Sequence, residues 1–248
     1  MLPFTNLLTQ QKYELNEEAH PVRIAVIDSG IDNSIDFLSR HIELMTGFDI
    51  DSKGQVYENA AMKVNHTHGT GVACIILSLC SKIKFVSINI LNSRLRSDGR
   101  ILIHAIRHAI NCGVDIINLS LGTTNPLYWF NLQRIMLMCR RKGIIVVAAG
   151  ENRGKRSYPS STWGVVRVAK NCSLTDNSKY TYSNGWYFGP HSANGLEAIQ
   201  ANSLQINGNS AAAAFITGHI ANLQVQKWHG YISNILKTLK SNASIYIL

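Results

Sequence analysis

The sequence predicts an α/β fold of three layers, in which a mainly parallel central sheet carries helices on both faces. Four short apolar runs have the length and composition of buried parallel strands, at residues 22–27, 85–90, 114–120 and 144–149. Helical stretches alternate with them, at residues 72–79, 100–112 and 126–142. Two of these stretches are followed by a glycine of the kind that ends helices, Gly113 and Gly143. This alternation favours parallel strands joined by helices.

Weaker signals complete the pattern. A strand is expected near residues 42–48 and another at 165–169, and the polar stretch from there to about Asn207 is interpreted as surface loop. A helix is predicted to start near Ser210, and an amphipathic helix lies near residues 230–241. Ligands of such sheets bind at the carboxyl ends of the strands, so we expect functional residues there.

Length and composition indicate one folded domain. The 248 residues, 46% of them hydrophobic and 16% charged, suffice for a sizeable core and exclude a mainly disordered chain. No linker or internal repeat divides the sequence. We therefore interpret residues 1–21 as an N-terminal extension and residues 22–248 as the domain.

The net charge is positive. Lys and Arg number 24 against 15 Asp and Glu, and this excess of +9 suits nucleic acid, an anionic membrane or an acidic peptide as partner. No aromatic-interleaved stripe or binding motif accompanies the densest basic runs, at residues 140–142 and 155–156. A solvated surface is therefore favoured, and neither a nucleic-acid nor a membrane partner is expected.

Cysteine usage and the N-terminus indicate a cytoplasmic protein. The five cysteines form no Cys-x-x-Cys pair, are odd in number and lie mostly in apolar segments, which suits a reducing compartment. The first eight residues lack the basic start, apolar core and cleavage site of a secretory signal. No apolar run reaches membrane-spanning length.

Three side chains stand where this architecture places chemistry. Asp28 follows a predicted strand, whereas His68 and Ser210 each stand at a predicted helix start. Singly, such residues usually cap turns or helices. Together they are the set that a serine nucleophile needs, because a base must take the hydroxyl proton and a buried carboxylate must orient that base. The order Asp, His, Ser is one of those known for this triad.

The blocks around these residues resemble those of the subtilisin-like serine peptidases, in the family's order. The triad blocks are residues 24–31, 68–73 and 208–213. Residues 117–122 are similar to the family's substrate-binding strand, and residues 146–154 to its oxyanion-asparagine segment. Five ordered blocks spread over residues 22–220 make chance agreement improbable. The resemblance implies a subtilisin-like fold, with the peptidase domain over residues 22–248.

Two blocks depart from the family pattern. The usual Gly-Thr-Ser-Met-Ala-Ala-Pro is Gly-Asn-Ser-Ala-Ala-Ala-Ala at residues 208–214, which keeps the serine, and Gly71 replaces the usual His after His-Gly-Thr. In the oxyanion segment either Glu151 or Asn152 takes the critical place. We choose Asn152, because a gapless match puts it there and an anionic Glu would repel an oxyanion.

The resemblance implies a role for each site residue. Ser210 is the nucleophile, His68 the general base and acid, and Asp28 the residue that orients His68; the Asn152 side chain and the Ser210 N–H hold the oxyanion. Substrate binding falls to Ser120, Leu121, Gly122, Ala149, Gly150 and Glu151.

The function that follows is an intracellular serine endopeptidase that acts through an acyl-enzyme. Only about two dozen residues precede the first strand, too few for a folded pro-domain, which favours processing of one dedicated peptide, such as the leader of a ribosomally made peptide natural product. The partner is then a peptide or precursor peptide, no cofactor is expected, and the oligomeric state is left open.

Two alternatives are kept. One is a catalytically degenerate peptide-binding protein of the same fold. The other is a zinc-dependent hydrolase that uses His66, His68 and Asp28, although no third ligand follows at a recognised spacing. Residues 49–54 begin like a calcium loop, but Lys53 and Ala60 replace oxygen ligands, so a turn is expected there.

Overall fold

The computed structural model describes residues 20–59, 64, 66–226 and 231–244. These build a nine-stranded sheet in the order β3-β2-β4-β1-β5-β6-β7-β9-β8. All neighbouring strands are parallel except at the two edges, where β2–β3 and β8–β9 are antiparallel. The strands are β1 (Val22–Asp28), β2 (Ile42–Ile50), β3 (Val56–Glu58), β4 (Ile83–Asn89), β5 (Ile116–Leu119), β6 (Ile145–Ala149), β7 (Val166–Asn171), β8 (Thr181–Ser183) and β9 (Trp186–Pro190).

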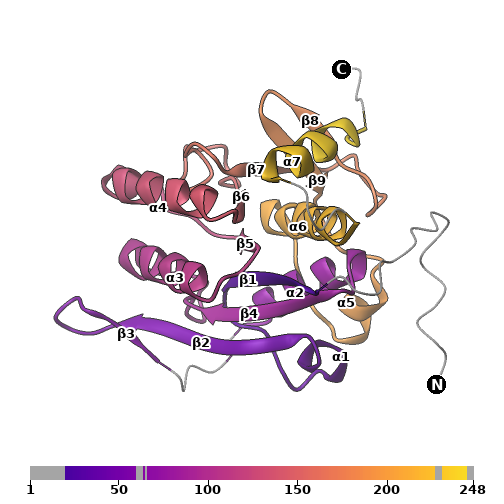
Figure 1. The fold of residues 1–248 in the computed structure, drawn as a ribbon. Coiled ribbons are helices and arrows are strands. Elements are labelled where there is room, and N and C mark those ends of the chain that lie inside the picture. Colours follow the sequence, from indigo (N-terminus) through magenta and orange to yellow (C-terminus); the bar gives the residue numbers. More distant parts are fainter. Residues whose placement is uncertain (1–19, 60–63, 65, 227–230, 245–248) are drawn as a thin grey trace.

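Helices cover both faces of the sheet, as the sequence predicts (Figure 1). One face packs against α2, α6 and α7, and the other against α3 and α4. The helices are α1 (Asp36–Ser39), α2 (His68–Leu79), α3 (Gly99–Asn111), α4 (Trp129–Arg141), α5 (Glu197–Ala201), α6 (Asn209–Gln226) and α7 (Ile232–Ser241), with a 3-10 turn η1 (Pro126–Tyr128) before α4. The three-layer α/β prediction is confirmed.

Strand β1 belongs to both cores because its side chains alternate between the two faces. Ile24 and Val26 join the core under α2 and α6, whereas Ala25 and Ile27 join the core under α3 and α4. All four are fully buried. This explains why the strand is a continuous apolar run rather than an alternating one.

Helix α6 is buried on nearly all sides. It packs against α2, α7 and the sheet, and 14 of its 18 residues are buried. A helix enclosed in this way needs small residues where neighbours come close. Gly218 meets this need, because a Cβ added there would stand 2.8 Å from the Cβ of Leu79 on α2.

The stretch up to Asn207 is not the continuous surface loop that the sequence suggests. It contains β8, β9 and α5, and Tyr187 of β9 is buried. A Cβ on Gly189 would lie 3.0 Å from the Ala212 carbonyl, so β9 packs tightly on α6. These elements are short. Strand β9 is ordered by contacts with β7 and α6, β8 pairs with β9, and α5 packs against α2, and no local pattern reveals these contacts.

Two further boundaries differ from the prediction. Strand β5 ends at Leu119, so Ser120, Leu121 and Gly122 follow the strand instead of belonging to it. The turn expected at residues 49–54 is present, with the Asp51 carboxylate accepting the backbone N–H groups of Lys53 and Gln55. The predicted N-terminal extension lies almost wholly outside the described residues.

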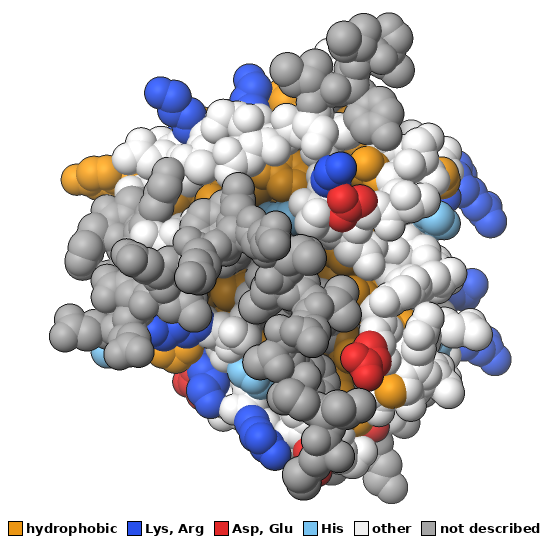
Figure 2. Space-filling view, turned by 90° about the vertical axis from the view of Figure 1, so that its right-hand side faces the viewer, with side chains coloured by type: hydrophobic (Ala, Val, Ile, Leu, Met, Phe, Trp, Pro, Cys, Tyr) orange, Lys and Arg blue, Asp and Glu red, His pale blue; other side chains and the backbone are white. Residues whose placement is uncertain are grey.

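The scattered charged side chains and the free cysteines are typical of a globular protein. Figure 2 shows Lys and Arg side chains at several separate places on one face, with acidic side chains among them. None of the helices in the described ranges has the length and apolarity to cross a membrane. The five cysteines are free thiols, and burial raises the pKa of Cys80 to about 11 and that of Cys74 to about 12.

A buried hydrogen bond joins β5 to α6. The Asn118 side chain donates to the Thr217 hydroxyl at 2.8 Å, and both residues are fully buried. Asn118 also accepts from the Ser120 hydroxyl at 3.0 Å. The interaction thus fixes the end of β5, where the predicted substrate-binding residues begin, to the helix that begins with Asn209 and Ser210.

Replacing Thr217 by Val keeps the shape of the side chain and removes its acceptor. We expect Thr217→Val to lower the free energy of unfolding by about 1–3 kcal/mol, since the buried Asn118 amide loses its partner. In an Asn118→Ala background the same change should cost clearly less. Urea unfolding of the four proteins measures this cycle, and equal costs in both backgrounds would show that the hydrogen bond is not the cause.

Candidate active site

Asp28 and His68, 40 residues apart in sequence, meet at the carboxyl end of the sheet. Asp28 is the last residue of β1, and His68 is the first residue of α2. The Nδ1 atom of His68 lies 2.8 Å from Oδ1 of Asp28. The carboxylate is fully buried, whereas 14% of the His68 side chain remains accessible. The imidazole therefore has one nitrogen bound to a buried anion and the other available on the opposite edge of the ring.

A close approach of α2 to the end of β1 makes this pair possible. A Cβ on Gly69 would lie only 2.4 Å from the Gly30 carbonyl oxygen, so a side chain at that position is excluded. The Ser29 hydroxyl accepts the Gly69 N–H at 3.0 Å and donates to the His66 carbonyl at 2.9 Å. Ser29 thus fixes the start of α2. The sequence analysis assigned no role to Ser29, although it is part of the Asp-Ser-Gly block.

Burial and the carboxylate act in opposite directions on His68. Burial of the imidazole lowers its pKa, while the hydrogen bond to Asp28 and the charge of that carboxylate raise it. The net effect is a pKa above the usual 6.5. In the neutral ring Nδ1 carries the proton toward Asp28, which leaves the other nitrogen as the proton acceptor.

Ser210 lies in the first turn of α6, beside the start of α2. The two helices pack together, and a Cβ on Gly71 would lie 3.2 Å from Ile206, just before the turn into α6. The helix starts that carry His68 and Ser210 are thus neighbours. The Ser210 hydroxyl donates to the Ser120 carbonyl at 3.1 Å, which places the serine at the first predicted substrate-binding residue.

Asn152 lies against the turn that leads into α6. Its Oδ1 atom accepts the Asn209 N–H at 3.1 Å. Gly208 has φ of +78°, and a Cβ there would come within 2.9 Å of the same oxygen. Because Oδ1 faces this backbone, the amide nitrogen is the end of Asn152 that remains to donate. The structure therefore brings Asn152, and a donor, next to Ser210.

Glu151 is oriented differently. Its carboxylate accepts the backbone N–H groups of Arg153 at 2.7 Å and Lys155 at 3.1 Å. The side chain thus closes the turn of its own loop. Among the described residues, Glu151 makes no hydrogen bond to the start of α6, whereas Asn152 accepts one from Asn209.

Asn209 is a positioning residue that the sequence analysis did not single out. Its side chain donates to the Gly150 carbonyl at 2.9 Å and accepts the Lys170 N–H at 2.8 Å. It ties the residue after β6 and strand β7 to the first turn of α6. One sequence signal points to this position: the family that the blocks resemble usually has Thr there, whereas this chain has Asn.

The predicted substrate-binding residues form two short segments near Ser210. After β5 the chain passes through Gly122 to Thr123, which pairs with Tyr158 through two backbone hydrogen bonds of 2.8 Å. A Cβ on Gly122 would lie 2.8 Å from the Tyr158 carbonyl oxygen. Ala149 ends β6, and Gly150 lies against the ring of Trp186. Ser120, Leu121 and Gly122 thus follow β5, while Ala149 and Gly150 follow from its neighbour β6.

The two histidines of the zinc hypothesis do not face one point. The Nδ1 atom of His66 accepts the backbone N–H of His68 at 3.1 Å, and the ring centroids are 6.3 Å apart. Within the described residues no group of three or more His, Cys, Asp or Glu side chains is arranged to hold a metal ion.

Comparison with known proteins identifies the family. The model of the subtilase family matches residues 20–243. The chain belongs to the subtilase family. This is a family of serine peptidases, and residues 20–243 cover most of the chain.

Three relatives illustrate the similarity. The chain is 24% identical to the thermostable alkaline protease of Halalkalibacterium halodurans, over 96% of this chain and 66% of that protein. It superposes on sphericase with a TM-score of 0.68 at 18% identity, covering 90% of this chain and 83% of the other. The crystal structure of a lanthipeptide protease superposes with a TM-score of 0.64 at 18% identity, covering 88% and 78%. The solved structures show the subtilisin-like fold, and the chain spans slightly less than two thirds of the alkaline protease.

The pH dependence of hydrolysis tests the pairing of His68 with Asp28. Only the neutral imidazole accepts a proton, so kcat/KM should rise with pH with a midpoint above 6.5. Asp28→Asn removes the charge that raises this pKa, so the midpoint should fall and kcat should drop by roughly ten-thousandfold. Asp32→Asn, a control in the following loop, should change neither. An unchanged midpoint in Asp28→Asn would contradict the assignment.

The second test separates Asn152 from Glu151. Asn152→Ala should lower kcat about a hundredfold or more with little change in KM, because a donor to the developing oxyanion is lost. Glu151→Ala loosens only the loop turn and should leave kcat within severalfold. Steady-state kinetics on one peptide compare the two variants, and the reverse result would show that Glu151 takes the place assigned to Asn152.

Proposed function

We propose that this chain is a serine endopeptidase in which Ser210 attacks the scissile carbonyl and His68 serves first as base and then as acid. The observation that carries the proposal is the 2.8 Å contact between His68 and the fully buried Asp28, at the helix start next to the one that bears Ser210. A buried carboxylate against Nδ1 fixes the tautomer and stabilises the imidazolium that forms during attack.

The reaction proceeds through an acyl-enzyme. The Ser210 hydroxyl turns from the Ser120 carbonyl toward His68, gives up its proton and adds to the substrate carbonyl. The oxyanion is held by the Asn152 amide nitrogen and the Ser210 N–H, and the N-terminus of α6 favours its negative charge. His68 then protonates the leaving amine. Water, deprotonated by His68, releases the acyl group in the same way.

The substrate is a peptide in extended form. Residues Ser120 to Gly122 follow β5, and the Ser120 carbonyl accepts from the Ser210 hydroxyl. The next residue, Thr123, pairs with Tyr158 along one edge of this segment. A substrate strand pairs with the other edge, while Ala149 and Gly150 border the residue before the cut.

A dedicated precursor peptide is the proposed physiological substrate, and the proposed setting is intracellular. Support for the substrate comes from the lanthipeptide protease among the similar structures. Support for the setting comes from five free cysteines, which suit a reducing compartment.

A fluorophosphonate probe, which reacts with activated serines, tests the mechanism directly. Ser210→Ala should abolish labelling and peptide cleavage while leaving thermal unfolding nearly unchanged, since one hydroxyl is lost. The control Ser173→Ala alters an exposed serine and should behave as wild type. A wild-type protein that never labels and leaves every tested peptide intact would favour the degenerate peptide-binding alternative.

A further inference from the structure

Most of the net positive charge lies in one part of the chain. Residues 116–175 contain nine Lys and Arg and one acidic residue, Glu151, so nine minus one gives +8 of the total +9. The rest of the chain is nearly balanced. This part runs from β5 through α4 to the segment after β7, so it includes the proposed substrate-binding residues.

The same part of the chain exposes large apolar side chains. Five of the ten large hydrophobic residues that are exposed among the described residues belong to it. They are Leu127 (82% exposed), Phe130 (60%), Trp163 (55%), Met138 (44%) and Trp129 (41%). They lie on η1, on α4 and on the segment that bonds to α4, and exposed apolar side chains gathered on one element are typical of an interaction site.

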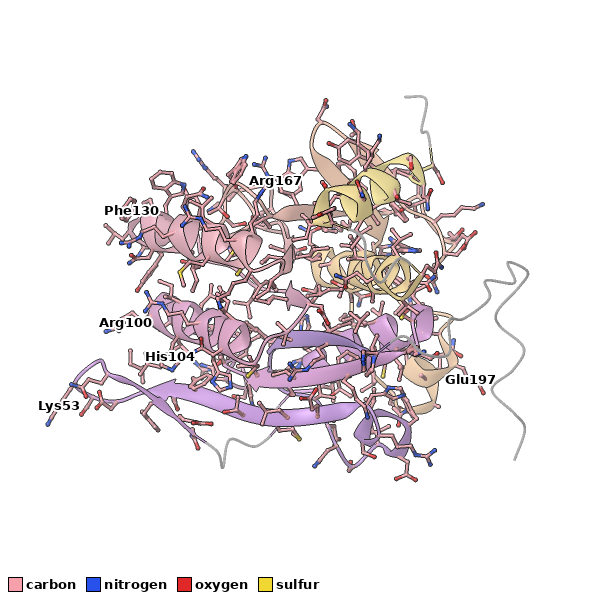
Figure 3. All side chains as sticks on the ribbon, viewed as in Figure 1. Lys53, Arg100, His104, Phe130, Arg167 and Glu197 are labelled. Carbon is pink, nitrogen blue, oxygen red and sulfur yellow. The ribbon has the colours of Figure 1, made fainter. Side chains whose placement is uncertain are left out.

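Two guanidinium groups of α4 lie over aromatic rings on the outer side of the helix. Phe130, Arg134 and Met138 are spaced by four residues and form one stripe of the helix, with the Arg134 guanidinium 5.8 Å from the Phe130 ring centroid. Figure 3 shows Phe130 pointing away from the sheet. We call Leu127, Phe130, Arg134, Met138, Arg140 and Trp163 the α4 face.

Trp163 is held on this face by two anchors. Its backbone N–H donates to the Gln133 side chain at 2.9 Å, and the Gln133 amide donates back to its carbonyl at 3.4 Å. The Arg140 guanidinium lies 4.4 Å from the Trp163 ring centroid. The pairing of Trp163 with Arg140 cannot be recognised in the sequence, because Trp163, 30 residues after Gln133, reaches the helix only in the folded chain.

The α4 face lies on the path of the substrate. The scissile bond sits at Ser210, beside Ser120, and from there the chain runs through Gly122 to Leu127 and α4. A substrate paired antiparallel to residues 120–122, the more stable arrangement, has its residues upstream of the cut beyond Gly122. Helix α4 is about 20 Å long, and an extended chain spans about 3.3 Å per residue, so a dozen or so upstream residues reach along it.

We propose that the α4 face binds a segment of the peptide substrate upstream of the cut, one that combines Asp or Glu with large apolar side chains. This rests on the proposed function in taking the ligand to be the substrate. Acidic side chains pair with Arg134 and Arg140, which have no acidic partner among the described residues, and apolar side chains cover Leu127, Phe130 and Met138. A single-stranded RNA is disfavoured, because the guanidinium groups already lie over the Phe130 and Trp163 rings.

Binding is measured on the full chain carrying Ser210→Ala, so that no peptide is cut. The probe is a fluorescent 16-residue peptide in which Leu, Phe and Glu recur along an extended chain, and the matched peptide has Lys at each Glu position. We expect anisotropy to show binding of the Glu peptide and none of the Lys peptide. Added to this background, Arg134→Glu and Phe130→Ser should each weaken binding about tenfold or more.

A control variant tests whether binding depends on where the charge is changed. Lys53→Glu makes the same kind of charge change at the β2–β3 turn, away from α4 (Figure 3), and should leave binding unchanged. Thermal unfolding checks each variant, and Arg140→Glu replaces Arg134→Glu if the latter does not fold. No binding of the Glu peptide at 1 mM, or equal binding to Arg134→Glu, overturns the proposal. So does Arg134-dependent binding of oligouridine or phosphatidylglycerol vesicles without binding of the Glu peptide.

Failure of this proposal and failure of the proposed function are distinguishable. Fluorophosphonate labelling of the wild type without binding of the Glu peptide rejects the α4 face alone. Binding of the Glu peptide by a wild type that never labels supports the α4 face as a peptide site and rejects the peptidase mechanism.

Discussion

The carboxylate of Asp28 is withdrawn from water at the end of β1, and this constrains its surroundings. Its Oδ1 atom accepts the Ser29 N–H at 2.7 Å and contacts His68, while Oδ2 has no hydrogen-bond partner among the described residues. A buried anion that is only partly satisfied depends strongly on each remaining donor. The approach of α2 to β1, the glycine at position 69 and the clamp formed by Ser29 all serve to keep His68 in place.

The sequence was sufficient where the signal is local or is carried by a motif. Strand β1 and helix α3 are apolar patterns that any core of this kind requires, and Asp28, His68 and Ser210 stand in recognisable blocks. The structure places Asp28 and His68 in contact, at neighbouring ends of elements that the sequence already located.

The features that escaped sequence reasoning depend on contacts between distant residues. Strand β9 has no clear period and is ordered by pairing with β7 and by packing on α6. Asn209 looks like an ordinary polar residue until its side chain is seen to link Gly150 and Lys170. Nothing in the linear chain indicates that Trp163 and Gln133 are hydrogen-bonded. In each case the role of the residue depends on contacts that form only in the tertiary structure.

Because α6 is enclosed on nearly all sides, it tolerates substitution less well than α4. Its 14 buried residues pack against the sheet and α2, so a substitution there disturbs packing on several sides at once and lowers stability. Helix α4 borders the core along one side only, and its outer residues are free to vary without loss of stability. The outer surface of α4 can therefore change in shape and charge, while α6, the helix that carries Ser210, remains nearly fixed.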